Sequence, residues 1–315
     1  MTAERIVVTG GAGFIGVHTV ELLLGDGAEV LVIDDLSHRS DRPLPGACEL
    51  VVHDVADAAA RRSIVAFNPA AVVHLAAQGG VNRSWRDPAR DARINVQGTV
   101  SVLQAAGDSG CARVVLASSG GALYGAAESL PAPEETRAQP RSPYGTAKWA
   151  AEQYVSYFER SRVFAAVSLR YGNVYGAGQD GTGEAGVVAI TSTRLARGDA
   201  PVIRGDGEQT RDFVHVSDVA RANAMAVKVR VTGALNIGTG HETSVNRVVE
   251  SLCRAARYTG DVEHEAMPPG EVRRSCLDVG RAATALGWSA ATQLDGGLHD
   301  TYRHFAEHGR ENRAH

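Results

Sequence analysis

The sequence contains few cysteines, and they lie far apart. Its 315 residues include four, Cys48, Cys111, Cys253 and Cys276, and no two of them form a C-x-x-C pair. A zinc site usually needs closely spaced cysteine pairs, and a disulfide framework needs a higher cysteine density. We therefore expect reduced thiols of a cytoplasmic protein, with no metal site.

The chain also lacks a run of lysines and arginines. Its formal net charge is −4, and nucleic-acid or membrane-surface binding usually needs a basic stripe. No apolar run is long enough to cross a bilayer. No signal peptide precedes the apolar run Ile6–Val8. These absences predict an intracellular, soluble protein without nucleic-acid or membrane partners.

Short apolar runs alternate with helical patterns through the first half of the chain. The expected strands are Arg5–Thr9, Glu29–Ile33, Glu49–His53, Ala71–Leu75, Arg113–Ser118 and Phe164–Arg170. The expected helices are Phe14–Leu24, Ala56–Phe67, Ala89–Ala106 and Tyr144–Arg160, with a loop over Ala126–Pro143. Strands that are apolar on both faces and alternate with helices indicate an α/β, Rossmann-type, doubly wound parallel sheet.

The second half begins with the glycine-rich stretch Gly172–Gly186 and a helix near Ala189–Arg197. Phe213–Val216 and Ala234–Ile237 are expected to return to the main sheet. Val245–Ala256 and Glu271–Leu286 are expected to build a smaller C-terminal lobe. The predicted division is a dinucleotide-binding domain of residues 1–172 and 213–240, and a substrate-binding lobe of residues 173–212 and 241–310.

A glycine-rich loop, Gly10 to Gly16, joins the first strand to the first helix. Gly10 permits a tight turn, Gly13 lets the backbone approach a pyrophosphate, and Gly16 lets helix and strand pack closely. The expected helix begins with Phe14 and Ile15. Its N-terminus offers unpaired N–H groups and a partial positive charge to the phosphates. The loop therefore predicts a dinucleotide site.

An acid, Asp34, ends the next strand. A carboxylate at that place accepts hydrogen bonds from the adenosine ribose hydroxyls and would repel a 2′-phosphate. The expected cofactor is therefore NAD, although His38 and Arg39 could soften the preference over NADP.

Tyr144 and Lys148 are four residues apart on one face of an expected helix. A tyrosine acts as a base near pH 7 only if its pKa falls from about 10 toward neutrality. A nearby ammonium and a positive nicotinamide ring both favour the phenolate. A Tyr and a Lys at this spacing are common in helices. The order found here, an NAD motif, then a strand that ends in Ser118-Ser119, then this pair, is much rarer.

Together these motifs resemble the extended short-chain dehydrogenase/reductase family, and most closely its UDP-sugar 4-epimerases. The resemblance covers nearly the whole chain and also rests on Asp54-Val55, His74–Ala77, Asn95, Tyr124-Gly125, Leu169–Gly176, Gly205–Val216, Leu277-Asp278 and Leu286–Trp288.

The resemblance implies roles for individual residues. The cofactor would contact the Gly10–Gly16 loop with Asp34, Asp35, Asp54, Val55, Leu75, Ala76, Ala77, Asn95, Tyr144, Lys148 and Tyr171. The sugar nucleotide would contact Ser84, Asn173, Val187, Arg211, Glu271 and Ser275, with Arg211 on a diphosphate oxygen. Tyr144, Lys148 and a serine hydroxyl would be catalytic. Arg211 could instead form a surface ion pair with Asp206 or Asp212.

The chain departs from the family pattern at three positions. Gly120 stands where many such epimerases carry the catalytic Ser or Thr, so Ser119, Ser118 or a water must supply that hydroxyl. Pro268 replaces an expected arginine, and the candidates to compensate for it are Arg273 and Arg204. Ser275 is a small residue at the expected gate to the hexose pocket, and a small gate would admit a 2-acetamido group.

The implied activity is NAD-dependent 4-epimerisation of a UDP-hexose such as UDP-glucose, through a transient 4-keto sugar. The alternatives are a UDP-N-acetylhexosamine or UDP-hexuronate 4-epimerase, a 4-ketosugar oxidoreductase, and a non-catalytic NAD sensor. A 4,6-dehydratase is disfavoured because Gly120-Gly121 stands where that class carries Asp-Glu. The resemblance also implies a homodimer, built from the helices over Ala89–Ala106 and Tyr144–Arg160.

Overall fold

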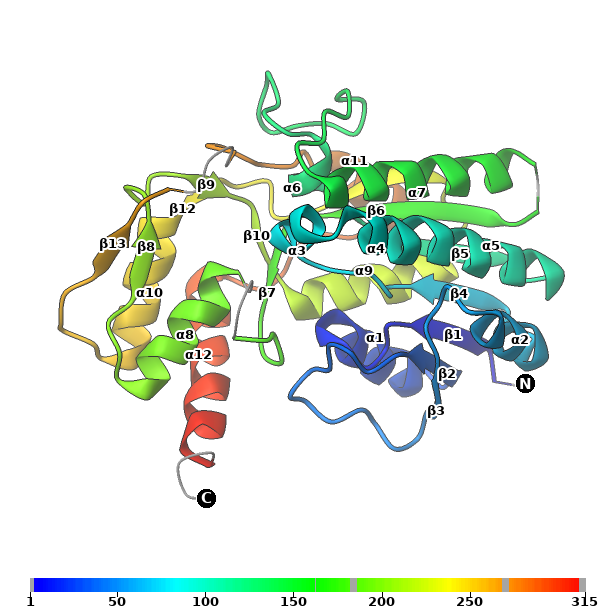
Figure 1. Cartoon of the computed structure of the whole chain (residues 1–315), viewed down its shortest axis with the longest axis horizontal. Coiled ribbons are helices and arrows are strands. Elements are labelled where there is room, and N and C mark those ends of the chain that lie inside the picture. Colours follow the sequence, from blue (N-terminus) through cyan, green and yellow to red (C-terminus); the bar gives the residue numbers. More distant parts are fainter. Residues whose placement is uncertain (1–2, 162, 182–185, 268–271, 312–315) are drawn as a thin grey trace.

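A seven-stranded parallel sheet forms the centre of the molecule (Figure 1). The computed structural model describes residues 3–161, 163–181, 186–267 and 272–311. The strand order is β3-β2-β1-β4-β5-β6-β11, with all neighbours parallel. The strands are β1 (Arg5–Thr9), β2 (Glu29–Asp34), β3 (Glu49–Val52), β4 (Ala71–His74), β5 (Arg113–Ser119), β6 (Ala165–Tyr171) and β11 (Gly233–Ile237). The Rossmann-type fold is therefore confirmed.

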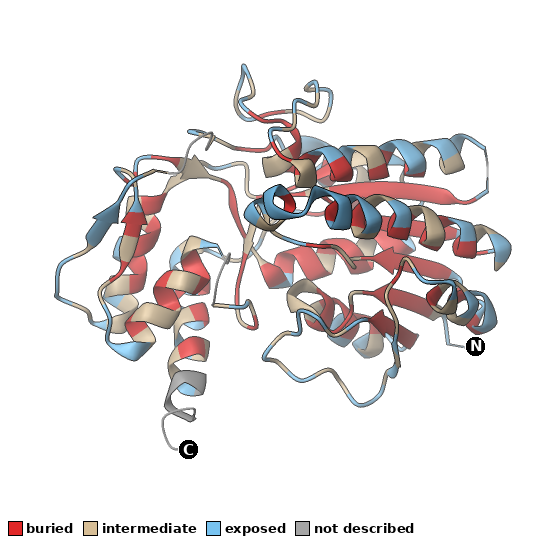
Figure 2. Cartoon of the chain, in the orientation of Figure 1, coloured by how far each residue is buried: buried red, intermediate tan, exposed pale blue. Residues whose placement is uncertain are grey.

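Helices cover both faces of the sheet, and each face has its own apolar core. On one face α1 (Phe14–Gly25) and α9 (Val216–Lys228) pack beside α11 (Gly280–Leu286). On the other lie α2 (Ala58–Phe67), α5 (Thr99–Asp108) and α7 (Pro143–Arg160). Figure 2 shows the resulting band of buried residues along the strands. Burial on both faces explains why β1, β2, β4 and β5 contain nearly continuous runs of Val, Ile and Leu.

The helix expected over Ala89–Ala106 consists of three parts. A short helix, α4 (Pro88–Ala92), leads into a π-helical turn, η1 (Arg93–Gly98), and then into α5. The remaining short helices are α3 (Val81–Arg86) and α6 (Gly120–Leu123). π-helical turns are rare and often occur at functional sites.

The expectation that Phe213–Val216 joins the main sheet is wrong. Instead, β10 (Phe213–His215) pairs with β7 (Asn173–Tyr175) in a separate two-stranded sheet. The chain then enters α9 directly at Val216. A three-residue apolar run does not reveal which strand it pairs with, and the length of the intervening segment allowed either placement.

Three helices form the core of the smaller lobe, on the left of Figure 1. They are α8 (Val187–Arg197), α10 (Val245–Ala256) and α12 (Leu294–Glu311). Two short sheets accompany them: β8 (Val202–Arg204) with β13 (Glu263–Glu265), and β9 (Thr210–Arg211) with β12 (Thr243–Ser244). In contrast, α11 and the buried Trp288 return to the core beside α9, although their segment was expected in this lobe.

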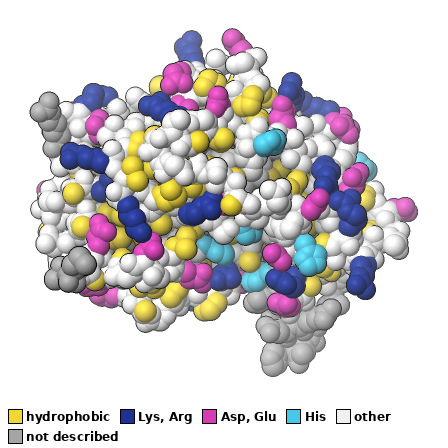
Figure 3. All heavy atoms as spheres, turned by 180° about the vertical axis from the view of Figure 1, so that it is seen from behind, with side chains coloured by type: hydrophobic (Ala, Val, Ile, Leu, Met, Phe, Trp, Pro, Cys, Tyr) yellow, Lys and Arg dark blue, Asp and Glu magenta, His cyan; other side chains and the backbone are white. Residues whose placement is uncertain are grey.

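The surface carries both signs of charge. In Figure 3, Lys and Arg side chains are interspersed with Asp and Glu side chains over the face shown. Among the helices of the described residues, none is long and apolar enough to cross a membrane.

Candidate functional site

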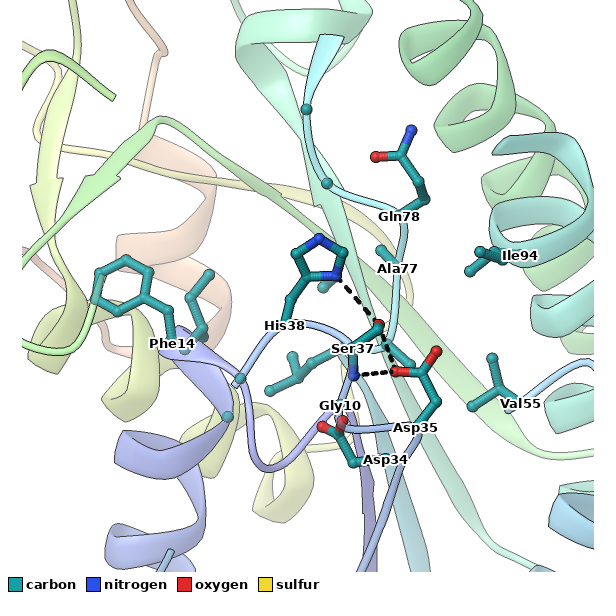
Figure 4. Close-up of a pocket in the computed structure, with 18 of the residues that line it drawn as sticks. Gly10, Phe14, Asp34, Asp35, Ser37, His38, Val55, Ala77, Gln78 and Ile94 are labelled. Carbon is teal, nitrogen blue, oxygen red and sulfur yellow. Dashed lines mark hydrogen bonds between the residues drawn. The ribbon is translucent and has the colours of Figure 1, made fainter. Parts of the chain in front are cut away.

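A cavity of about 640 Å³ lies at the carboxyl ends of the strands. Ligands of doubly wound sheets bind at this edge, where the strand order reverses, here between β1 and β4. Figure 4 shows Asp34, at the end of β2, with Asp35 and His38 from the segment that follows it, facing the segment after β4 that carries Ala77 and Gln78. The expected residues that line the cavity are Gly10, Gly13, Phe14, Ile15, Gly16, Asp34, Asp35, Asp54, Val55, Leu75, Ala76, Ala77, Ser118, Tyr144, Lys148 and Tyr171.

Two positions of the loop after β1 require glycine. Gly10 has a φ of +69°, and a Cβ there would lie 2.5 Å from the backbone nitrogen of Ala76. A Cβ on Gly16 would collide with the carbonyl oxygen of Gly10. The loop therefore packs against both the segment after β4 and helix α1. The N–H groups of the first turn of α1 border the cavity.

Asp34 fixes the shape of this loop from the end of β2. Its Oδ2 accepts a hydrogen bond of 3.0 Å from the backbone of Ala12, and its Oδ1 one of 2.8 Å from that of Leu36. Burial raises the pKa of the carboxyl. Asp34 thus joins β1 and β2 while lining the cavity.

The opposite wall carries the tyrosine and the lysine. Helix α7 begins at Pro143 after Ser142, whose hydroxyl accepts a hydrogen bond from the backbone of Gly145. This cap places Tyr144 in the first turn and Lys148 one turn later. The Lys148 ammonium is buried and donates a 2.9 Å hydrogen bond to the carbonyl of Ala117. It lies 5.9 Å from the centre of the Tyr144 ring.

The expected fall in the pKa of Tyr144 does not occur in the protein alone. Burial and, to a smaller extent, the negative charge of Asp91 together raise the pKa of Tyr144 to about 12, and the hydrogen bond with Ser119 opposes this rise. Burial also lowers the pKa of Lys148 to about 8, although Asp91 and Glu152 favour its ammonium form. Desolvation therefore decides the direction of the pKa shift at both side chains.

The two serines at the end of β5 have different partners. The hydroxyl of Ser119 is hydrogen-bonded to Tyr144 and accepts a hydrogen bond from the backbone of Ala122. The hydroxyl of Ser118 donates to Glu152, at 2.6 Å. Glu152 also forms a buried ion pair with Arg170, at 2.7 Å. Ser119 is thus the serine whose hydroxyl meets Tyr144.

Two residues expected at the cofactor have other partners as well. Asn95, in the π turn, is not among the cavity-lining residues and is hydrogen-bonded to Gln78 and Asp91. Tyr171 lines the cavity, but its hydroxyl donates to Asn223, at 2.6 Å. Its ring rather than its hydroxyl is available to a ligand.

Three of the expected sugar-side residues lie around one buried acid, Asp212. The backbone of Asn173 donates to the carbonyl of Asp212, and Arg211 precedes Asp212 in the chain. The backbone of Ser275 donates to the carbonyl of Thr210, next to Arg211. Asn173 and Ser275 both face Gly121, where an added Cβ would lie 3.7 Å from Asn173 Oδ1 and 4.0 Å from Ser275 Oγ.

The other expected sugar-side residues lie elsewhere. Ser84 is buried in α3 and donates to the carbonyl of Val81. Val187 begins α8 and packs in the core of the smaller lobe. Glu271 and Pro268 are outside the described residues. Arg273, one of the two arginines expected to compensate for Pro268, forms a two-bond ion pair with Asp206.

Gly120 has no room for the side chain that many epimerases carry there. An added Cβ would lie 2.6 Å from a methyl carbon of Leu277. Leu277 is buried, and its backbone donates to Asp212. The Leu277 side chain therefore occupies the space that a side chain at position 120 would take.

Sequence reasoning missed three buried residues: Gln78, which lines the cavity, and Asp91 and Glu152 behind it. Glu152 follows Lys148 by one helical turn, and Asp91 precedes Asn95 by four residues, so helical spacing could have indicated both. Within the part of the chain that the structure describes, no three His, Cys, Asp or Glu residues are grouped to hold a metal ion.

Comparisons with known proteins agree with this geometry. The chain is 39% identical over 307 residues to the UDP-glucose 4-epimerase of Mycolicibacterium smegmatis, covering 96% of this chain and 98% of the relative. The structure of UDP-glucose 4-epimerase with UDP-glucose from Thermotoga maritima matches with a TM-score of 0.94 and 40% identity, over 96% of this chain and 99% of that one.

A second solved structure is UDP-N-acetylglucosamine 4-epimerase from Methanobrevibacter ruminantium, in complex with UDP-N-acetylmuramic acid. It matches with a TM-score of 0.92 and 30% identity, over 98% of this chain and 100% of that one. Residues 6–238 match the NAD dependent epimerase/dehydratase family. The chain therefore belongs to the NAD dependent epimerase/dehydratase family.

Proposed function

We propose that the chain is an NAD-dependent sugar-nucleotide 4-epimerase that interconverts UDP-glucose and UDP-galactose through a transient 4-keto sugar. The observation that carries the proposal is the single cavity that joins the glycine loop to Tyr144 and Lys148. Whole-length similarity to UDP-glucose 4-epimerases supports the choice of reaction.

The cavity fits NAD along its whole length. Acidic and apolar residues, Asp34, Asp54 and Val55, line the end suited to adenosine, and Gly10–Gly16 presents backbone N–H groups to a pyrophosphate. Tyr144 and Tyr171 line the far end, which suits the nicotinamide. When bound, NAD supplies the reversible oxidation of the sugar at C4.

The protein's own groups then manage one proton. Tyr144, as phenolate, takes the proton from the sugar 4-hydroxyl and later returns it. Ser119 holds the same oxygen through its hydroxyl, and the Lys148 ammonium favours the phenolate. Because burial raises the pKa of Tyr144 to about 12, the positive charge of bound NAD is part of what makes Tyr144 a base.

We propose that Asn173, Ser275 and Arg211 form the sugar-nucleotide side, with Arg211 on the diphosphate. Ser84, Val187 and Glu271 remain candidates for further contacts. We propose a division in which residues 1–172 and 213–240 bind the cofactor and residues 173–212 and 241–310 bind the substrate. Within the second range, α11 packs on the main sheet.

A dehydratase is disfavoured by the space at Gly120. That class needs acidic side chains where this chain has Gly120-Gly121, and Leu277 already fills the volume beside Gly120. The second candidate is a UDP-N-acetylhexosamine 4-epimerase, favoured by the small Ser275 and by the similarity to a UDP-N-acetylglucosamine 4-epimerase. A hexuronate substrate stays an alternative, because a similar solved structure, 35% identical to this chain, is a complex with UDP-glucuronic acid and NAD.

We also propose that the protein is a homodimer. Large apolar side chains are exposed on α3 and α7, among them Trp85 (62% exposed), Trp149 (42%) and Tyr157 (58%). A second copy of α7 would cover them, as the family resemblance implies. Light scattering of the purified protein tests this, since a monomer at micromolar concentration would contradict it.

The activity is tested by incubating the purified protein separately with UDP-glucose, UDP-N-acetylglucosamine and UDP-glucuronate. NMR of the product should show UDP-galactose from UDP-glucose, with unchanged mass. Loss of water would indicate a dehydratase, and a change of two hydrogens a net oxidoreductase. No turnover of any of these substrates would contradict the proposal and favour a non-catalytic NAD sensor.

A further inference from the structure

Three buried polar side chains, Gln78, Asp91 and Asn95, form a cluster near Tyr144 and Lys148. Asp91 Oδ1 accepts hydrogen bonds of 3.0 Å from Gln78 Nε2 and 3.0 Å from Asn95 Nδ2. The backbone N–H of Gln78 in turn donates to Asn95 Oδ1, at 2.9 Å. The three residues are 1–7% exposed. Gln78 lies on the cavity wall (Figure 4), and Asp91 is in α4, which leads directly into the π turn.

This cluster is incompletely satisfied. Within the described part of the chain, neither Asp91 Oδ2 nor Gln78 Oε1 has a hydrogen-bond partner, and both are buried. Buried polar groups are rarely unpaired, because each such group costs about 1–3 kcal/mol. Both atoms are acceptors, so the cluster calls for donors or positive charge.

The nearby positive charge is Lys148. Asp91 interacts electrostatically with both Lys148 and Tyr144. The other carboxylate that acts on Lys148, Glu152, already has a cation of its own, because Arg170 forms an ion pair with it at 2.7 Å. Asp91 is therefore the acid whose charge is left to balance the buried ammonium.

Other titratable groups around the pair do not take this role. His74, on β4, is neutral, because burial lowers its pKa to about 3. Burial raises the pKa of Tyr171, on β6, so it also stays neutral. The charged groups that face Tyr144 and Lys148 are thus Asp91 from α4 and Glu152 from α7.

We propose that Asp91, held by Gln78 and Asn95, is a positioning residue that keeps the Lys148 ammonium charged and in place beside Tyr144. This role rests on the proposed epimerase activity, in which Lys148 must remain an ammonium while Tyr144 exchanges its proton. The carboxylate acts through Lys148 and does not itself line the cavity.

The chain is well suited to a direct test, since Lys148 and Lys228 are its only lysines. Protein purified with its bound cofactor and labelled with ¹³C,¹⁵N-lysine would give two side-chain signals. Lys228 forms an exposed ion pair with Asp26 and serves as the internal reference. The titration midpoint of Lys148 is then followed by NMR from neutral to alkaline pH.

The critical variant is Asp91→Asn, which keeps an oxygen for Gln78 and Asn95 and puts an N–H group in place of the unpartnered oxygen. The titration midpoint of Lys148 in this variant should be lower by about one pH unit, which is the usual effect of losing one nearby opposite charge. Asp91→Glu should stay closer to the wild type. Asp108→Asn, which removes an exposed carboxylate paired with Arg61, should not move the midpoint.

The pH profile of kcat/KM provides the second readout. Asp91 raises the pKa of both Lys148 and Tyr144, so Asp91→Asn should displace the whole profile toward acid pH. A purely structural role would lower the rate without displacing the profile. Should Asp91→Asn fail to fold, Asp91→Ser removes the same charge and permits the same comparison.

A Lys148 midpoint that is the same in folded Asp91→Asn and wild-type protein would overturn the inference. The NMR titration needs no substrate. Absence of epimerisation would therefore count against the proposed function alone, and an unmoved midpoint against the role of Asp91 alone.

Discussion

The cofactor side and the sugar side of the site are built differently. The cofactor side is made by the carboxyl ends of β1 to β6, the segments that follow them and the start of α7, all at one edge of one sheet. The proposed sugar side consists of Asn173, Arg211 and Ser275, from short strands and connecting segments around Asp212. In this proposal the sheet fixes where the cofactor lies, whereas a few side chains decide which sugar is accepted.

Asp212 shows how the sugar side depends on a single residue. Its carboxylate accepts hydrogen bonds from the backbones of Thr239, Gly240 and Leu277, at 2.7 to 3.2 Å. By contrast, the cofactor side is held by backbone pairing along the strands. Substitutions on the cofactor side should therefore abolish binding, and those on the sugar side should change selectivity.

The largest effect is expected for Gly10→Ala. The new Cβ would meet the backbone of Ala76 and strain a residue with a φ of +69°, so bound NAD and all turnover should be lost. Gly27→Ala is the matched control, because Gly27 has a φ of +84° but no atom within 4 Å of its Cβ position. It should lose about 1–2 kcal/mol of stability and keep its NAD, as measured by absorbance and thermal unfolding. Retention of NAD by Gly10→Ala would show that the loop is not the cofactor wall.

Tyr144→Phe should lower kcat by roughly 10²–10⁴-fold, the usual contribution of a general base. The fold and the bound NAD should be unchanged, because the ring remains. Tyr154→Phe, which alters an exposed tyrosine on the same helix, should retain wild-type turnover in the same assay. Near-normal epimerisation by Tyr144→Phe would remove Tyr144 from the mechanism.

The adjacent serines should separate catalysis from stability. Ser119→Ala should lower kcat by about 10²-fold, since it removes a hydroxyl that meets Tyr144. Ser118→Ala should instead lower the free energy of unfolding by about 1 kcal/mol, since it removes a hydrogen bond to the buried Glu152. Steady-state kinetics and denaturant unfolding of both variants check this. Equal kinetic defects would contradict the assignment.

The smallest effect is expected for Ser275→Tyr on the sugar side. The larger side chain should narrow the space beside Asn173 and lower kcat/KM for UDP-N-acetylglucosamine by about 10–100-fold. The value for UDP-glucose, which lacks the acetamido group, should change little and serves as the internal control. An equal loss for both substrates would mean that Ser275 does not select at C2.

The cofactor side could be predicted from the sequence because its signals are local. Gly10, Gly16 and Asp34 belong to one strand-loop-helix-strand unit, and spacing alone indicates their roles. All the expected cofactor residues except Asn95 line the cavity. Their contacts with NAD itself stay a prediction.

The remaining features depend on tertiary contacts. Pairing of Phe213–His215 with β7 is set by segments some forty residues apart, and no local pattern reveals it. The rise in the pKa of Tyr144 reflects burial, which helix spacing does not report. The fit between Gly120 and Leu277 likewise joins positions that are distant in the chain.

In the proposed mechanism, the hydrogen removed from the sugar at C4 returns to the same carbon. The most direct measurement is incubation of the purified protein, without added NAD, with UDP-glucose deuterated at C4. We expect UDP-galactose that retains the deuterium at C4, detected by NMR and mass spectrometry. Loss of the deuterium to solvent, or the absence of any product, would contradict this mechanism.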